Sequence, residues 1–191
     1  GLATTSLFGI DSHGIKLLPH YVRAAKNGRI NLNPQYQFTL KSHCAGVLDA
    51  DHAFGHHAGT VAMNKALQLA KEFGLGAISV ANSSHYGAAG FFAIKAAYQD
   101  MIGLSFTHAD SLMLSANGKR PFFGTNPISF CAPVEGEEPF YLDMATTSIS
   151  WNQVMLSSSQ DQNLQPGWAV DENGDGTIDP KLARALNSIG G

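Results

Sequence analysis

Residues 58–80, AGTVAMNKALQLAKEFGLGAISV, contain the strongest secondary-structure signals in the chain. Apolar side chains recur at three- and four-residue spacing from Ala58 to Phe73, which is the period of a helix with one buried face. Gly74 is a typical helix stop, because glycine adopts the left-handed backbone without steric cost. The apolar run at 77–80 then predicts a strand.

On either side of this segment in the sequence, we predict further helices over 17–25 and 88–98. We predict strands over 46–50, 102–106, 128–132 and 140–143. The alternation of Ile102, Leu104 and Phe106 with small residues predicts a half-buried strand. The later strands follow one another through short connections. This order favours an α+β (mixed α/β) fold, with a mostly antiparallel or mixed sheet flanked by helices, over a doubly wound parallel sheet. The polar stretch 157–180 predicts a long exposed loop, and residues 181–186 predict the start of a helix.

The composition is that of an ordinary globular protein. The 191 residues are 44% hydrophobic and 14% charged, with a formal net charge of -3, so we expect no nucleic-acid or membrane partner. No apolar run approaches the roughly 20 residues of a membrane helix. We therefore expect small molecules or other protein chains as partners. The isolated thiols Cys44 and Cys131 suit a reducing compartment, with cytoplasm as the default, and we expect them to be buried apolar side chains.

Several common site motifs are absent from the sequence. GxGxxG, the Walker A pattern, GxSxG and HExxH do not occur, so any nucleotide site must be built in another way. Residues 171–179 match the first nine positions of a calcium-binding EF-hand loop. Leu182 stands where the loop requires a bidentate glutamate, so we predict a polar turn there and no metal site.

The histidines His52, His56 and His57 form the basis of an alternative from another functional class. His52 and His56 would share one face of a helix, at a spacing that can bind zinc, as in a zinc hydrolase or a metal-binding protein. The Phe54-Gly55 pair between them weakens that helix. We therefore favour exposed histidines at the start of a helix.

Four segments carry a specific pattern: DSHGI at 11–15, SSHYGAAG at 83–90, GTNPI at 124–128 and LDMATT at 142–147. Their order and spacing resemble the malate/L-lactate dehydrogenase-like family, which includes ureidoglycolate, sulfolactate and diketogulonate enzymes and ketimine reductases. The resemblance spans nearly the whole chain. It implies a non-Rossmann, homodimeric oxidoreductase that moves a hydride between NAD or NADP and a 2-oxo/2-hydroxy acid, or alternatively reduces a cyclic ketimine.

Two histidines are the catalytic candidates. An imidazole with a pKa of about 6.5 can give and take a proton at neutral pH, as interconversion of a carbonyl and an alcohol requires. The resemblance assigns proton transfer to His13 with Ser12 beside it, and His85 is the second candidate. We expect the rings of His13 and His85 to converge on one cleft.

The turn that contains His85 precedes a helix, whose first N–H groups and positive dipole end suit an anionic group. Asp143 ends a predicted strand and is followed by small residues, where the backbone can lie flat against a ribose or pyrophosphate. The resemblance implies cofactor contacts from these two segments and from the GTNPI turn, namely from His85, Gly87, Ala88, Ala89, Thr125, Asn126, Asp143, Met144 and Ala145.

The sequence differs from many members of the family at a residue that is expected to contact the substrate. Many members carry an arginine four residues after the histidine of the SHG segment, where it is thought to clamp the substrate carboxylate, and this chain has Leu17. Leucine cannot make that bidentate contact, so Lys16 or Arg23 is expected to supply the charge. Gln153 replaces an acidic residue of some relatives. A catalytically inactive relative that only binds ligands is therefore a further hypothesis.

The resemblance also predicts the organisation of the chain. We expect residues 1–50 to form part of a substrate and dimerisation domain and residues 51–191 to form a cofactor-binding domain that is incomplete at its C-terminus. We interpret Gly1 and the Gly190-Gly191 pair as cut ends. Relatives begin earlier with N-terminal helices and continue with a Lys-Gly-x-Gly segment at the cofactor site.

Overall fold

The computed structural model describes residues 1–189, so the Gly190-Gly191 pair lies outside the described residues. The helices are α1 (Leu2–Leu7), α2 (Leu18–Lys26), α3 (Gly55–Phe73), α4 (Gly90–Ala97) and α5 (Trp151–Ser159), with short 3-10 helices η1 (Asp11–His13) and η2 (Ile15–Leu17). The strands are β1 (Gln37–Leu40), β2 (Ala45–Ala53), β3 (Ala77–Ser83), β4 (Gly103–Phe106), β5 (Met113–Leu114), β6 (Pro121–Phe123), β7 (Ile128–Ala132), β8 (Phe140–Met144), β9 (Ala169–Val170), β10 (Gly176–Thr177) and β11 (Ala185–Leu186).

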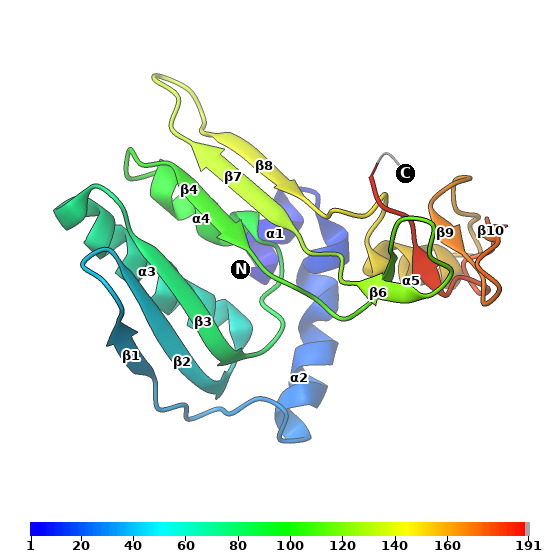
Figure 1. Cartoon of the computed structure of the whole chain (residues 1–191), viewed down its shortest axis with the longest axis horizontal. Helices are drawn as coiled ribbons and strands as arrows, with labels where there is room; N and C mark the ends of the chain where they lie inside the picture. The colour runs from blue at the N-terminus through cyan, green and yellow to red at the C-terminus, as the bar shows by residue number, and fades with distance from the viewer. Residues whose placement is uncertain (190–191) are drawn as a thin grey trace. The chain divides into compact units, whose positions relative to one another are not determined.

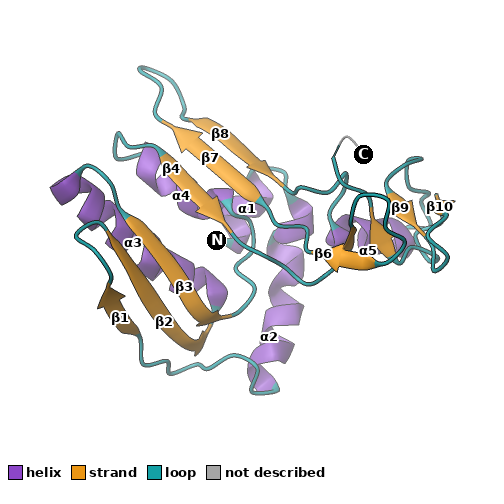
Figure 2. Cartoon of the chain, viewed as in Figure 1, coloured by secondary structure: helices purple, strands orange, loops and turns teal. Residues whose placement is uncertain are grey.

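The chain divides into two compact units. The first consists of residues 1–103 and 130–141, and the second of residues 104–129 and 142–189. Helices and strands are mixed in the chain, as Figure 2 shows, and the sheets contain both antiparallel pairs (β1 with β2) and parallel pairs (β2 with β3). The predicted α+β class is therefore confirmed. No helix within the described part of the chain is both long enough and apolar enough to cross a membrane.

In the first unit, helix α3 packs against β2 and β3 (Figure 1). Ala58, Ala62 and Leu69 are buried, and Gly74 ends the helix with a φ of 80°, as predicted. The helix starts at Gly55, three residues before the predicted start at Ala58. A residue distant in sequence causes this extension, because the Gly55 N–H donates a hydrogen bond of 3.0 Å to Ser84 Oγ.

Strands β4, β7 and β8 form a three-stranded sheet in the order β4-β7-β8. The strand predicted to be half-buried is present as β4, and its buried side carries small residues. Leu104 and Phe106 are 50% and 60% exposed, whereas Gly103 is buried. A Cβ atom at Gly103 would overlap the carbonyl oxygen of Ala93 in α4, so only the side of the strand with small residues can approach that helix.

The same preference for small residues holds in β7. Ser129 and Cys131 are fully buried, and Cys131 packs against Ala93, Ile94 and Ala97 of α4. The expected burial of Cys131 is therefore confirmed. Cys44 is only half-buried, and its Sγ atom lies 3.8 Å from Ser42 Oγ.

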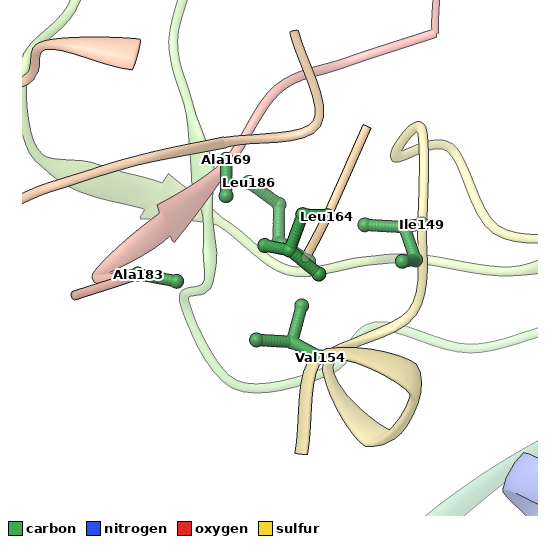
Figure 3. Close-up of a cluster of buried hydrophobic side chains, with 6 residues drawn as sticks. All are labelled: Ile149, Val154, Leu164, Ala169, Ala183 and Leu186. Atoms are coloured by element: carbon green, nitrogen blue, oxygen red, sulfur yellow. The ribbon is translucent and has the colours of Figure 1, made fainter. Parts of the chain in front are cut away.

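The second unit has its own apolar core, in which side chains from separate segments converge (Figure 3). Val154 of α5 and Leu186 of β11 are its largest fully buried members. The core consists of Ile149, Val154, Leu164, Ala169, Ala183 and Leu186. Long-range hydrogen bonding explains why the predicted helix at 181–186 was wrong. The Leu186 N–H donates to the Leu112 carbonyl at 2.8 Å, which makes this segment a strand.

The predicted exposed loop at 157–180 was only partly correct. Its first residues complete helix α5, and Ala169 and Val170 are buried in strand β9. The segment 171–179 is the polar turn that the sequence predicts. Asp171 Oδ1 accepts hydrogen bonds from the backbone N–H groups of Asn173 and Asp175 at 2.8 and 3.1 Å, so this carboxylate closes a hairpin turn between β9 and β10.

Candidate active site

The rings of His13 and His85 lie together in the first unit. Their centroids are 5.9 Å apart and their planes differ by 19°, which is a stacked arrangement. His13 ends the short helix η1, and His85 lies in the loop between β3 and α4. The two imidazoles therefore lie side by side as expected, but His13 is not among the residues that line the cavity at His85, so a shared cleft stays a prediction. Their chemical roles stay predictions.

His13 is oriented by its sequence neighbour. The Ser12 Oγ atom lies 3.0 Å from His13 Nδ1, at hydrogen-bond distance. Burial lowers the pKa of His13 below its usual value, because the charged imidazolium loses hydration. The His13 ring is consequently neutral at neutral pH.

His85 is oriented by Tyr21, a buried residue of α2. The Tyr21 Oη atom lies 2.6 Å from His85 Nδ1. Burial raises the pKa of the Tyr21 phenol far above neutrality, so its hydroxyl keeps its proton. A hydroxyl can donate to a ring nitrogen or accept from it, and either arrangement directs the other nitrogen, Nε2, away from Tyr21. Sequence motifs give Tyr21 no role, and its position shortly after the DSHGI motif is the signal that could have pointed to it.

The backbone that carries His85 is held by the start of α3. Ser84 Oγ accepts a hydrogen bond from the Gly55 N–H and donates one to the Ala53 carbonyl, each at 3.0 Å. Helix α3 approaches so closely that a Cβ atom at Gly55 would overlap the carbonyl oxygens of Ser84 and His85. The position of His85 therefore depends on the absence of a side chain at Gly55.

A small cavity of about 20 Å³ adjoins Tyr21 and His85, and an arginine to which the sequence motifs gave no role, Arg29, is among the residues that line it. It is lined by His20, Tyr21, Ala24, Arg29, Ile30, Ser84 and His85. Lys16 and Arg23, the expected sources of positive charge, are not among the lining residues. Arg29 is thus the arginine that the structure brings beside Tyr21 and His85.

The three histidines of the zinc alternative lie in different surroundings. His56 is buried against the rings of Tyr21 and Phe54, neither of its nitrogens has a hydrogen-bond partner in the described structure, and burial lowers its pKa to about 4. His57 Nδ1 lies 2.6 Å from Tyr36 Oη, and His52 lines a separate groove. No group of three histidine, cysteine or acidic side chains within residues 1–189 could hold a metal ion. The geometry gives the zinc alternative no support.

The larger cavity of the first unit, about 260 Å³, lies elsewhere. Its lining is polar and consists of Gln35, Gln37, Asp49, Asp51, His52 and Asn82. The Asp51 N–H and the Asn82 side-chain amide both donate to Asp49 at 2.9 Å, and these bonds hold the pKa of Asp49 below its usual value. Asp51 and His52 have positive φ angles of 47° and 58° where the strand register shifts. These polar groups stabilise an irregular strand end, and we assign them a structural role.

Of the expected cofactor residues in the first unit, Gly87, Ala88 and Ala89 are buried at the start of α4. Gly87 has a φ of 78°, and a Cβ atom there would lie 2.5 Å from Nε2 of His56. The N-cap residue of α4 is Ala89, whose methyl side chain cannot accept a capping hydrogen bond. The segment is therefore built from small residues because the backbone passes close to its neighbours.

The other expected cofactor residues lie in the second unit. The Thr125 carbonyl accepts hydrogen bonds from the N–H and the hydroxyl of Thr146 at 2.9 and 3.0 Å, just beyond the Asp143-Met144-Ala145 segment that ends β8. Asn126 has a φ of 32°, and its Oδ1 atom accepts from the Ala109 N–H at 3.1 Å. Thr125 and Asn126 thus tie together the loops of this unit, and their contact with a cofactor stays a prediction.

Comparison with known proteins gives one consistent family. The sequence profile described as malate/L-lactate dehydrogenase matches residues 1–191. A malate dehydrogenase from Pyrococcus abyssi is 37% identical, with 91% of this chain and 48% of that protein covered. A ureidoglycolate dehydrogenase (NAD(+)) from Escherichia coli O157:H7 is 34% identical, with 93% and 51% covered.

The fold agrees with that comparison. The crystal structure of Δ1-piperideine-2-carboxylate reductase from Pseudomonas syringae pvar. tomato superposes with a TM-score of 0.94 at 27% identity, covering 100% of this chain and 58% of that one. The chain spans about half the length of the curated relatives described above.

Proposed function

Because the chain belongs to the malate/L-lactate dehydrogenase family, we propose that it forms the histidine-bearing part of an oxidoreductase that transfers a hydride between NAD or NADP and a 2-oxo/2-hydroxy acid. The stacked pair His13 and His85, with rings 5.9 Å apart, is the observation that carries the proposal. Each ring has its Nδ1 atom at hydrogen-bond distance from a hydroxyl, on Ser12 and on Tyr21. Two imidazoles oriented in this way are suited to proton transfer at a carbonyl or alcohol oxygen.

We take His85 as the ring that exchanges the proton with the substrate. Two adjacent imidazoles resist double protonation because like charges repel, and burial lowers the pKa of His13. In reduction, His85 Nε2 would give its proton to the carbonyl oxygen. In the opposite direction it would take the proton from the substrate hydroxyl. Tyr21, as the partner of Nδ1, would leave Nε2 as the atom that exchanges the proton.

The residues fit a nicotinamide cofactor in their chemistry. In the first unit, the small segment Gly87–Ala89 directly precedes helix α4. Within the second unit, the half-buried carboxylate of Asp143 lies near the end of β8 and is followed closely by Ala145. A carboxylate of this kind can accept hydrogen bonds from ribose hydroxyls, and small residues let a backbone approach a ligand. When bound, the cofactor supplies or accepts the hydride, and the protein contributes orientation and the proton.

If Tyr21 orients His85 through the contact between its hydroxyl and Nδ1, removal of that hydroxyl should slow turnover. In the intact protein, Tyr21→Phe is expected to lower kcat about fivefold and to change KM less than about twofold, because it removes one hydrogen bond, worth about 1 kcal/mol, from His85. Tyr36→Phe is the matched control, since Tyr36 Oη lies at the same distance of 2.6 Å from Nδ1 of His57, outside the cavity. Steady-state kinetics on both variants check this. Equal losses of kcat in the two variants would contradict a specific role for Tyr21.

The test of the function is a screen of the intact protein. NADH and NADPH would each be offered with a panel of 2-oxo acids, and loss of the reduced nicotinamide absorbance band would be followed. We expect acid-dependent oxidation of one nucleotide. Failure of every acid, with neither nucleotide bound by fluorescence, would favour the ligand-binding hypothesis instead.

A cyclic imine is the second candidate substrate, favoured by the similarity to the Δ1-piperideine-2-carboxylate reductase structure. Reduction of C=N needs a hydride at carbon and a proton at nitrogen, which the same histidine can supply. The screen therefore includes a cyclic imine carrying a 2-carboxylate, and the ratio of kcat/KM for imine and ketone distinguishes the two substrates.

We further propose that the intact protein is a cytoplasmic homodimer, in which residues 1–50 serve substrate and subunit contacts and the residues from 51 onward serve the cofactor. The family relationship and the absence of disulfides in the described part of the chain support this proposal. Sedimentation equilibrium of the intact protein tests the dimer.

A further inference from the structure

The position of Arg29 is set by the end of helix α2. The Gly28 N–H donates to the Ala25 carbonyl at 3.1 Å, the Arg29 N–H donates to the Ala24 carbonyl at 2.9 Å, and Gly28 has a φ of 72°. This is the Schellman arrangement, which turns the chain back along the helix that it has just left. The next residue, Ile30, is 5% exposed and anchors the turn. Arg29 is thereby held beside the helix that carries Tyr21.

Arg29 forms no ion pair with a carboxylate within residues 1–189; the ion pair present there, between Lys181 and Asp161, lies in the other unit. Arg29 is an exposed residue and is one of those that line the same cavity as His85. An arginine can bind a carboxylate through two parallel N–H bonds, so an anionic ligand group is its natural partner in this cavity.

The size of the cavity restricts what enters it. A volume of about 20 Å³ exceeds the roughly 10–15 Å³ that one water requires on this type of measure, and it is too small for a whole substrate. One small polar group, such as a carboxylate, is the appropriate occupant. Malate, ureidoglycolate and Δ1-piperideine-2-carboxylate, the compounds that name the relatives above, all carry a carboxylate on the carbon that reacts or next to it.

We propose that Arg29 binds the substrate carboxylate beside His85, and thereby supplies the charge that Leu17 cannot. This inference rests on the proposed function for its choice of substrate. Lys16 and Arg23 do not line the cavity, so neither is required for the contact. A carboxylate held by Arg29 would direct the adjacent carbon and its oxygen toward His85.

The test measures binding directly and therefore does not depend on turnover. Calorimetry of the intact protein would use oxamate, an inert isostere of a 2-oxo acid, and its neutral ethyl ester. We expect Arg29→Gln to weaken oxamate binding about 10- to 100-fold and to leave ester binding within about twofold, because only the acid loses a charged hydrogen bond. Lys26→Gln is the matched control, since Lys26 is an exposed cation that ends helix α2, three residues before Arg29, and does not line the cavity.

Each outcome decides the question. A selective loss of oxamate affinity in Arg29→Gln supports the inference even if the protein reduces no 2-oxo acid, in which case only the proposed function fails. Unchanged oxamate affinity in Arg29→Gln overturns the inference even if the wild type is an active dehydrogenase. A wild type that binds oxamate no better than its ester, or a selective loss in Arg23→Gln instead, also overturns it.

Discussion

Replacing His85 with asparagine is expected to lower kcat of the intact protein by about 10²- to 10⁴-fold, the usual contribution of a positioned general acid or base. Asparagine keeps a polar side chain but cannot take up and release a proton at neutral pH. Since His85 is partly exposed and its role is chemical, the free energy of unfolding should change little. Kinetics of nicotinamide oxidation, together with urea unfolding, measure both quantities.

The control for this variant is His57→Asn. His57 is also held by a tyrosine hydroxyl, Tyr36, but it lies outside the cavity, so its replacement should leave kcat within about twofold of wild type. His13→Asn should also reduce kcat, and the double variant should lose less than the product of the two single losses, because the stacked rings act together. An His85→Asn variant as fast as wild type would remove His85 from the mechanism.

Replacing Gly55 with alanine is expected to destabilise the protein by about 3 kcal/mol, at the upper end of typical overpacking costs. The new Cβ atom would overlap the carbonyl oxygens of Ser84 and His85, and these are backbone atoms that no rotamer change can move. The loop must shift, and His85 shifts with it. A displacement of about 1 Å at a catalytic group can reduce turnover about 100-fold, so we also expect a loss of kcat.

Gly176→Ala is the matched control for this substitution. A Cβ atom at Gly176 would meet no heavy atom within 4 Å. Its free energy of unfolding, measured with urea, should therefore stay within about 0.5 kcal/mol of wild type. Equal stability and activity in Gly55→Ala and Gly176→Ala would show that the contact between α3 and the His85 loop does not position the site.

The local signals were reliable where neighbours in the sequence suffice to form the structure. Helix α3 ends at Gly74 as predicted, because glycine alone decides a left-handed stop, and Asp171 closes its own turn through bonds to nearby N–H groups. Local sequence signals gave wrong predictions where a contact with a residue distant in the sequence determines the structure. The helix predicted at 181–186 became a strand through the hydrogen bond from Leu186 to Leu112. The core face of β4 was likewise decided by a distant contact, the close approach of α4 at Gly103.

In the candidate site, too, some features follow from the sequence and others depend on the tertiary structure. The sequence by itself determined the family and the motif pair that contains His13 and His85, because the order and type of these residues are properties of the chain. Only the tertiary structure decided that Tyr21 orients His85, that Ser84 caps α3 at Gly55, and that Arg29 rather than Lys16 or Arg23 lines the cavity. Hydrogen bonds and charge contacts act over a few ångströms in space, and spacing along a chain does not specify which distant side chains come that close.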